Sequence, residues 1–389
     1  MRANPGGILK IDEVLGRDAL ISDLWDTLEN QSVVMTAERR IGKTSVIRKM
    51  RAEPRDGWIA VLQDLEQYHS AEEFAVSVYK AVAEYLSPRA KAVQVLKKLW
   101  EEVGGSEFAG VLKLPPGPEG SWKSLLSRTV ESLTAHQADR RLVFFWDEMP
   151  YMLDNIGKAQ GEAVARQLLD LLRALRQMHP GFRMVLTGSI GLHHVLAELR
   201  QEDYRSEPLN DLCQIEVPPL SRPHAEALAR ELITGEGLVS ANLDESAATL
   251  AREGDCFPFY IHNIVRSLKR AGSTASPEAV VDCVQEQLVD PNDPWELGHF
   301  RSRIPSYYPG QQALVSGVLD VLAHEEGCLD LSELLSAIKA QMPFDDRDGL
   351  IAVLRLLERD HYLRRDRQGR YGFRFPLIRR WWRLDRGLA

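Results

Sequence analysis

The stretch VVMTAERRIGKTSVIRKM, residues 33–50, has the residue types and glycine spacing of a segment that holds phosphate groups. It is close to the pattern G-x-x-x-x-G-K-[ST], in which backbone N–H groups surround phosphates at the positive end of a helix. Lys43 is expected to reach the β- and γ-phosphate oxygens, and Thr44 to bind Mg²⁺. The expected phosphate-binding residues are Arg39, Arg40, Ile41, Gly42, Lys43, Thr44 and Ser45.

Ala37 stands where this pattern has its first glycine. Its methyl group is harmless if the local φ is negative, and a positive φ would cost about 1–2 kcal/mol, which such a loop survives. A chance GKT in a surface turn is the alternative interpretation. The context favours a phosphate loop, because a run of β-formers precedes it and a helix is expected directly after it.

A second pattern with chemical meaning is LVFFWDE, residues 142–148, in which five apolar residues lead into two acids. Asp147 is expected to orient Mg²⁺ and its waters, and Glu148 to polarise the attacking water as a general base. A buried strand that ends in two acids is by itself more often a helix cap. A preceding phosphate loop in the same α/β unit reverses that preference.

A third polar element, TGS (187–189), ends the next expected strand. In nucleotide hydrolases with an extra strand between the phosphate loop and the acidic strand, a polar residue here contacts the γ-phosphate or the attacking water. Ser189 is the first candidate and Thr187 the second; a simple cap at a strand–helix turn is the alternative. An arginine finger from a neighbouring subunit has only Arg200 and Arg205 as candidates, and loop arginines are usually solvated.

These residues must be positioned by an α/β domain, because apolar strands alternate with amphipathic helices over the first part of the chain. We expect a parallel sheet covered on both faces. Its expected strands are residues 33–36, 58–65, 140–148, 182–189 and 213–220. Its expected helices are 44–53, one that follows a capping box of Ser70 and Glu73, 87–100 and 167–178, with a loop or small excursion at 110–122.

Beyond this region the pattern is helical. A helix is expected at 221–233 with Ser221 as its cap, and more helices to about 290. Helices at 311–325, 330–341 and 346–360, a hairpin of 361–366 with 370–375, and a terminal helix are typical of a winged helix. The predicted domains are a core (1–220), a helical lid (221–305) and a winged helix (306–389).

Composition limits the function classes. The 389 residues are 44% apolar, and no stretch approaches the ~18 consecutive apolar residues of a membrane span. The N-terminal MRANPGGILK lacks the apolar region of a secretory signal, so we expect a cytoplasmic protein without membrane association. The four cysteines are far apart with no C-x-x-C pair, which predicts neither a disulfide framework nor a zinc site.

Charge is unevenly distributed. Residues 355–386 hold eleven arginines against four acids, a net +7, which leaves −15 on the rest of the chain. This asymmetry indicates either a nucleic-acid surface or a basic domain docked on an acidic one. The helix expected at 346–360 presents mainly acids outward, unlike a major-groove reader, whereas the hairpin carries Arg364, Arg365, Arg367 and Arg370. Protein docking is therefore favoured over DNA contact through the hairpin.

Several segments together resemble a known family. TAERRIGKTSVIRKM, FFWDEMPYML, VLTGSIGLHHVL and GDCFPFYIHNIV are similar to signatures of the archaeal-type ATPases of the STAND group, P-loop relatives of AAA+ proteins with Orc/Cdc6-like architecture. The resemblance implies an ATP-binding core, a lid and a winged helix. It implies that Arg39 and Arg40 belong to a basic phosphate loop, that Gly16 and Arg17 line the nucleotide base, and that Pro258 senses nucleotide state. Ala37 and Glu38 replace a commoner Gly-Pro.

Together these patterns predict a P-loop ATPase that binds ATP with Mg²⁺ and hydrolyses it slowly. Nucleotide state would control oligomerisation or the binding of a protein partner. The alternative is an ATP-dependent DNA-binding protein of the Orc/Cdc6-like or regulator type that uses its winged helix. A weaker third possibility is a pseudo-enzyme that binds nucleotide only structurally.

Overall fold

The computed structural model describes residues 1–88, 90–108, 111–113, 121–136, 140–188, 191–199 and 207–388. The chain divides into two compact units. The sheet unit contains Arg17–Thr36 and Lys43–Val217, and the helical unit contains Met1–Gly16, Ala37–Gly42 and Pro218–Ala389. The division into a core, a lid and a winged helix stays a prediction. Within the described residues, no helix is long and apolar enough to span a membrane.

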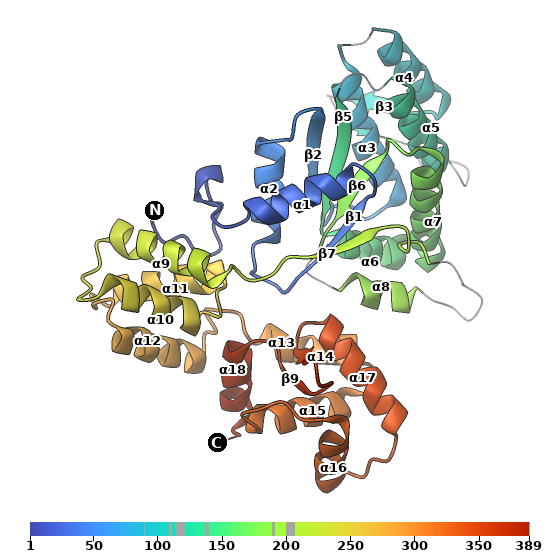
Figure 1. Ribbon diagram of the computed structural model, residues 1–389. Coiled ribbons are helices and arrows are strands. Elements are labelled where there is room, and N and C mark those ends of the chain that lie inside the picture. Colours follow the sequence, from blue (N-terminus) through green and yellow to red (C-terminus); the bar gives the residue numbers. More distant parts are fainter. Residues whose placement is uncertain are drawn as a thin grey trace. The chain divides into compact units, whose positions relative to one another are not determined.

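The sheet unit contains the expected parallel sheet, so the α/β prediction is confirmed (Figure 1). Its strands run in the order β2-β5-β6-β1-β7. They are β1 (Val33–Thr36), β2 (Trp58–Asp64), β5 (Arg141–Asp147), β6 (Arg183–Leu186) and β7 (Cys213–Glu216). The strand β6 therefore lies between the strand before the phosphate loop and the acidic strand, as expected for a sheet with one extra strand between them.

Helices cover both faces of this sheet, with α1 and α2 on one side and α3, α5 and α7 on the other (Figure 1). The helices of this unit are α1 (Asp18–Leu28), α2 (Lys43–Ala52), α3 (Ala71–Leu86), α4 (Ala90–Glu102), α5 (Ser121–Ala135), α6 (Met149–Gln160), α7 (Glu162–Met178) and α8 (Leu192–Glu198). Because successive side chains of a strand alternate between faces, continuous apolar strands such as β5 supply both cores.

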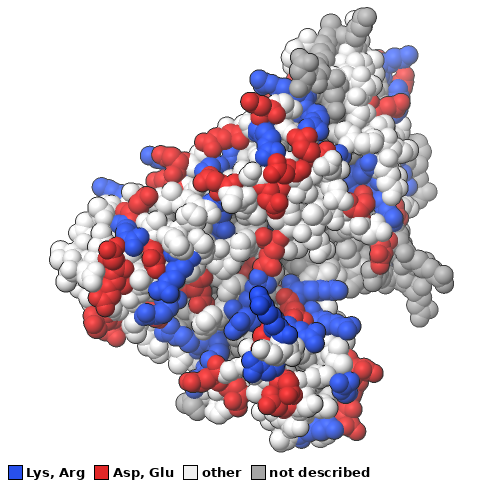
Figure 2. Space-filling model, viewed as in Figure 1, with Lys and Arg blue, Asp and Glu red and all other residues white. Residues whose placement is uncertain are grey.

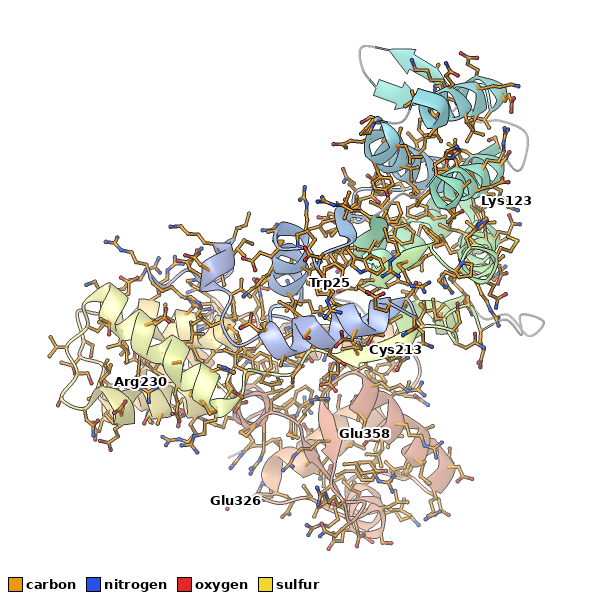
Figure 3. The ribbon with its side chains drawn as sticks, turned by 45° about the horizontal axis from the view of Figure 1, so that its top comes forward. Trp25, Lys123, Cys213, Arg230, Glu326 and Glu358 are labelled. Carbon is orange, nitrogen blue, oxygen red and sulfur yellow. The ribbon has the colours of Figure 1, made fainter. Side chains whose placement is uncertain are left out.

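Aromatic packing shows this alternation along β5. Phe145 points toward α1, where its ring centroid lies 6.2 Å from that of Trp25, a side chain labelled in Figure 3. Trp146 points to the opposite face, with its centroid 5.0 Å from that of Phe74 on α3. Its indole N–H donates to Gln63 Oε1 at 2.8 Å, so the buried polar atom is satisfied. The acid that follows Trp146 is thus held by a strand packed on both sides.

Some expectations about local structure were wrong. In the region 110–122, expected to be a loop or a small excursion, β4 (Val111–Lys113) pairs antiparallel with β3 (Ser106–Phe108), and α5 begins at Ser121. Ser70 caps α3, but Glu73 accepts from the His69 N–H at 2.8 Å rather than from Ser70.

At the end of the sheet unit, β7 is shorter than predicted, because two prolines, which cannot donate to a neighbouring strand, follow closely at 218 and 219. Ser221 precedes the next helix without capping it, since its hydroxyl lies 2.8 Å from His224 Nδ1 instead.

The helical unit contains a four-helix group, α9 to α12, and a C-terminal group, which consists of α15 to α18 with the hairpin β8–β9. Its elements are η1 (Ile11–Glu13), α9 (Arg222–Glu236), α10 (Leu243–Glu253), α11 (Pro258–Arg270), α12 (Pro277–Val289), α13 (His299–Ser302), α14 (Ile304–Tyr307), α15 (Gln312–His324), α16 (Leu331–Gln341), α17 (Arg347–Arg359), β8 (Leu363–Arg365), β9 (Tyr371–Phe373) and α18 (Pro376–Arg386). The N-terminal residues join this unit, since the Asn4 N–H donates to His262 Nδ1 at 3.1 Å.

The C-terminal group has the three helices and the hairpin that the sequence predicts. The hairpin turns at Gly369, whose φ of 83° suits glycine, and a bridge from Leu329 to Tyr371 adds a third short strand partner. Trp381 and Trp382 on α18 are buried, and the Trp382 indole N–H donates to Asp320 on α15 at 2.8 Å. These tryptophans therefore close the core of the C-terminal group.

A polar joint connects the four-helix group with α18. Asp255 accepts a hydrogen bond at 2.7 Å from the backbone N–H of Leu377, in the first turn of α18. Glu253 pairs with Arg380 at 2.5 Å. Asp255 and Cys256 both have left-handed backbone, with φ of 49° and 57°. Burial raises the pKa of Asp255 to about 7, against the opposing effects of the Leu377 N–H and of Arg380.

The raised pKa of Asp255 predicts how the stability of the protein depends on pH. Folded Asp255 keeps a proton that the unfolded chain, with an ordinary pKa of 3.8, releases, so its favourable contribution is present below pH ~4 and is lost as pH rises through about 7. Asparagine retains the acceptor oxygen but does not titrate. We therefore expect Asp255→Asn to lose less stability between pH 4 and pH 8 than wild type, measured as Tm. The exposed Asp244→Asn should follow wild type; parallel profiles for Asp255→Asn and wild type would contradict the assignment.

Candidate functional site

The strand ends of the sheet unit bring the predicted polar residues together. Thr44, in the first turn of α2, donates from Oγ1 to Asp147 Oδ2 at 3.0 Å, although 103 positions separate them in the sequence. Lys43 is the first residue of α2 and is only 8% exposed. Its positive charge acts on Asp147 and lowers the pKa of that carboxyl. Thr44, Lys43 and Asp147 thus form one cluster, as the sequence predicts.

The protonation of Asp147 reflects this position. Burial raises the pKa of Asp147, and this effect exceeds the opposing hydrogen bonds from Thr44 and from the backbone N–H of Glu148 and the charge of Lys43. Asp64 ends the neighbouring strand β2 in register with Asp147, and its negative charge raises the pKa further. A carboxyl in such surroundings favours a cation beside it, because a cation stabilises the ionised form.

Glu148 follows Asp147 in a left-handed conformation, with φ 57° and ψ 35° at the N-cap of α6. Its side chain makes no capping hydrogen bond. A Cβ built on Gly188, just beyond β6, would lie 3.5 Å from Glu148 Oε2 and 2.5 Å from Pro150 Cδ. Glycine at 188 therefore allows the chain beyond β6 to pack closely against Pro150, beside the Glu148 carboxylate.

Thr187 is the described member of the third predicted element. It is 3% exposed, and its Oγ1 has no hydrogen-bond partner within the described part of the chain. Its backbone is fixed, because its N–H donates to Trp146 O at 3.0 Å and its carbonyl accepts from Met149 N at 3.0 Å. Ser189, the first candidate, and Arg200 and Arg205, the arginine-finger candidates, lie outside the described residues.

Two residues of the loop before α2, Arg40 and Gly42, have positive φ. Gly42 has φ 102°, and a Cβ added there would meet nothing within 4 Å, so open space borders the loop at this residue. Ala37 is not among the described residues with positive φ, so its methyl group carries no cost from a left-handed backbone. Arg40 has φ 68°, a left-handed backbone that costs about 1–2 kcal/mol outside glycine.

The two arginines of this loop are paired within the helical unit. Arg39 Nη2 lies 2.9 Å from Glu296 Oε2, and Arg40 bonds to the other oxygen of the same carboxylate. Ile41 is 1% exposed, and Ser45 is half-buried on α2. The sequence did not indicate Glu296 or the partners of Glu38, because they lie more than 250 positions away in irregular segments.

The remaining predicted site residues are Gly16, Arg17 and Pro258. Gly16 has φ 66°, and a Cβ there would lie 2.7 Å from His224. Arg17 is the N-cap residue of α1, is 4% exposed, and has its pKa lowered to about 10 by burial. Pro258 is the first residue of α11, where a fixed φ suits the start of a helix. Their roles toward a nucleotide stay predictions.

Comparison with known proteins supports the fold. No family model matches the chain, and neither does any curated protein. The Walker-type ATPase PABY2304 of Pyrococcus abyssi is similar in structure, with a TM-score of 0.63 at 17% identity, over 96% of this chain and 97% of that one. The ORC2 protein of Aeropyrum pernix, solved as ADPNP and ADP complexes, gives 0.52 at 10% identity, over 98% and 96%. The chain therefore shares its fold with these two proteins.

The backbone of Glu148 generates a stability prediction. A left-handed residue with a Cβ costs about 1–2 kcal/mol relative to glycine, so Glu148→Gly should relieve strain that Glu148→Ala retains. Both variants lose the carboxylate and its contacts, so their difference isolates the backbone. We expect the Gly variant to have the larger free energy of unfolding, by about 1 kcal/mol in denaturant titrations. Equal stability, or a more stable Ala variant, would contradict the strain.

Proposed function

We propose that this protein is an ATP-binding molecular switch that hydrolyses ATP slowly and couples nucleotide state to oligomerisation or partner binding. The observation that carries the proposal is the 3.0 Å hydrogen bond from Thr44 to Asp147. It joins the hydroxyl of a phosphate-loop sequence to the acid that ends the buried strand β5. The strand order and the P-loop ATPase fold supply the context for this contact.

The phosphate groups of ATP are assigned to the start of α2. Backbone N–H groups around Gly42 and the positive end of the helix attract anions, and Lys43 adds a full charge on the β- and γ-phosphates. Arg39 and Arg40 belong to the same loop and would add charge-assisted bonds once released from Glu296. Gly16 and Arg17 are proposed to line the base, and Pro258 to respond to nucleotide state at the start of α11.

Thr44 and Asp147 fit the ligand set of Mg²⁺. Their contacting atoms are a hydroxyl and a carboxylate oxygen, the hard donors this ion prefers, and burial leaves Asp147 with a raised pKa that a cation would relieve. When bound, Mg²⁺ would neutralise charge on the phosphate oxygens. Asp147 would hold the ion's coordination in place, and Thr44 would orient it relative to Lys43.

Hydrolysis is assigned to Glu148 as the base that polarises the attacking water. Its carboxylate lies near Gly188 beyond the end of β6, and its backbone is left-handed, as residues held in strained conformations at functional sites often are. Thr187 supports the same location, because its buried hydroxyl has a donor free to bond a water or a phosphate oxygen. Ser189 stays the first proposed residue for that contact.

The base assignment is tested with Glu148→Gln, which keeps shape and removes the charge. We expect turnover of ATP to fall by ~10²–10⁴-fold while ATP binding persists, because loss of a general base typically costs that much. Lys43→Ala should lose binding itself. Asp154→Asn, which alters another acid on α6 that pairs with Lys158 at 2.6 Å, is the matched control and should turn over ATP normally.

The same variants test the switch. Glu148→Gln trapped with ATP should remain in one assembly state, measured as molar mass in solution, whereas wild type should return to its starting mass as ATP is consumed. Unchanged turnover in Glu148→Gln would contradict the role of the base. A mass that ignores ATP in both proteins would contradict coupling to assembly and leave a protein that binds nucleotide only structurally.

A second candidate function is ATP-dependent DNA binding through the hairpin. Figure 2 shows Lys and Arg side chains gathered over part of the C-terminal elements, with acids around them. Much of the basic tail is engaged with the protein: Arg380 pairs with Glu253 and Arg386 with Asp320. On the hairpin, however, Arg364, Arg365 and Arg367 are exposed. These three side chains could contact phosphates without reading base sequence.

For DNA binding we expect only weak, salt-sensitive affinity. Three phosphate contacts give a slope of about −2.7 in log K against log salt, so that little duplex binding remains near 0.2 M salt. Fluorescence anisotropy with labelled duplex across a salt series measures this slope. A triple Arg364→Gln, Arg365→Gln, Arg367→Gln variant should flatten it. Tight binding that persists near 0.2 M salt would contradict the preference for a protein partner.

A further inference from the structure

Two ion pairs of opposite polarity join the phosphate loop to a connecting segment, which we define as residues 293–303 between α12 and α14. Arg39 and Arg40 on the loop pair with Glu296 on the segment. Glu38 on the loop pairs with Arg303 on the segment, whose Nη1 and Nη2 each lie 3.5 Å from a carboxylate oxygen. All of these residues belong to the helical unit. The loop and the segment therefore carry complementary charge patterns.

The Glu38 pair is the buried one of the two. Glu38 is 3% exposed, and its Oε1 also accepts the Arg39 N–H at 2.8 Å. Burial alone would raise the pKa of Glu38, but the charge of Arg303 and the neighbouring His299, whose Nε2 lies 3.5 Å from Glu38 Oε1, lower it to about 2. A carboxylate that stays ionised in a buried position needs its partner, because an unpaired buried charge is costly. This pair therefore anchors the loop to the segment.

Arg303 is itself held by the C-terminal group. Its Nε donates to the Tyr362 hydroxyl at 2.8 Å, and its Nη2 donates to Asp360 O at 2.9 Å. Its guanidinium also lies over the ring of Phe300, 4.7 Å from the centroid. The anchor thus extends from the phosphate loop to the residues between α17 and β8.

The Glu296 pair differs, because it is open to solvent. The side chains of Arg39 and Glu296 are 43% and 44% exposed. Glu296 is presented by a defined turn: it has φ 54°, and Asp293 accepts the N–H groups of Leu297 at 2.8 Å and Gly298 at 2.7 Å. Trp295 beside it is fully buried. The turn therefore fixes where the Glu296 carboxylate lies, while the pair itself stays accessible.

A carboxylate bridging two guanidinium groups uses the same donors that a phosphate would use. From these contacts we infer that Glu296 is a built-in competitor of the nucleotide phosphates for Arg39 and Arg40. The Glu38–Arg303 anchor keeps this competitor beside the loop at high effective concentration, whether or not Glu296 is bonded. Nucleotide binding must displace Glu296. A partner that pulls the connecting segment away therefore strengthens nucleotide binding, and nucleotide strengthens the binding of that partner by the same factor. This inference rests on the proposed function.

The test is Glu296→Gln, which removes the charge of an exposed side chain and keeps its size. We expect the Kd for Mg²⁺-ATP to fall by at least about fivefold, the lower end of typical coupling between sites. The matched control is Asp385→Asn. It removes an ion pair that the same segment makes through Arg301, at 3.0 Å, away from the loop arginines, and should leave the Kd at the wild-type value.

A second measurement follows the segment directly in the wild-type protein. Saturating ATP should speed amide hydrogen exchange in residues 293–298, where Glu296 is released, while exchange near the buried anchor at 299–303 stays slow. An unchanged or weaker Kd in Glu296→Gln, with normal ATP binding by wild type and loss of binding in Lys43→Ala, overturns this inference alone. Failure of wild type to bind ATP overturns the proposed function and this inference with it.

Discussion

The hydrogen bond between Thr44 and Asp147 is the contact on which the candidate site depends. It requires that the helix after the phosphate loop and the end of an apolar strand meet at one edge of the sheet. The strand order achieves this, because β6 spaces β1 from β5 and brings its own polar end, Thr187, beside them. Burial raises the pKa of this carboxyl, and a cation beside it would favour its ionised form.

Several residues of the phosphate loop and of the strand ends have backbone conformations or unpaired polar groups that lower the stability of the fold. Arg40 and Glu148 adopt left-handed backbone, and Thr187 buries a hydroxyl without a partner among the described residues. Strain of this kind persists where the surrounding fold over-determines it and where function benefits. In the helical unit, Asp255 and Cys256 repeat the pattern directly before Pro258, at the joint with α18. Left-handed backbone thus occurs in the phosphate loop, after the acidic strand and directly before Pro258.

The sequence was sufficient for the sheet and for the residues on its strand ends. Strand residues 33–36 and the acidic strand could be placed because apolar runs, loop chemistry and the start of a helix all agreed. Contacts between distant irregular segments could not be predicted. Nothing in the sequence connects Glu38 with Arg303, 265 positions later. Ala37 and Glu38, in place of the commoner Gly-Pro, indicated only that the loop was unusual. Local hydrogen bonds were also missed, as at Ser221, where the neighbouring His224 competes for the hydroxyl.

The central claim is that Thr44 and Asp147 hold the magnesium of a bound triphosphate. The most direct measurement is equilibrium binding of ATP to the purified protein with and without Mg²⁺, for wild type and for Thr44→Val. The account predicts that wild type binds ATP more tightly with Mg²⁺ and that Thr44→Val folds normally but loses this enhancement. Absence of ATP binding by wild type, or an enhancement that survives unchanged in Thr44→Val, would contradict it.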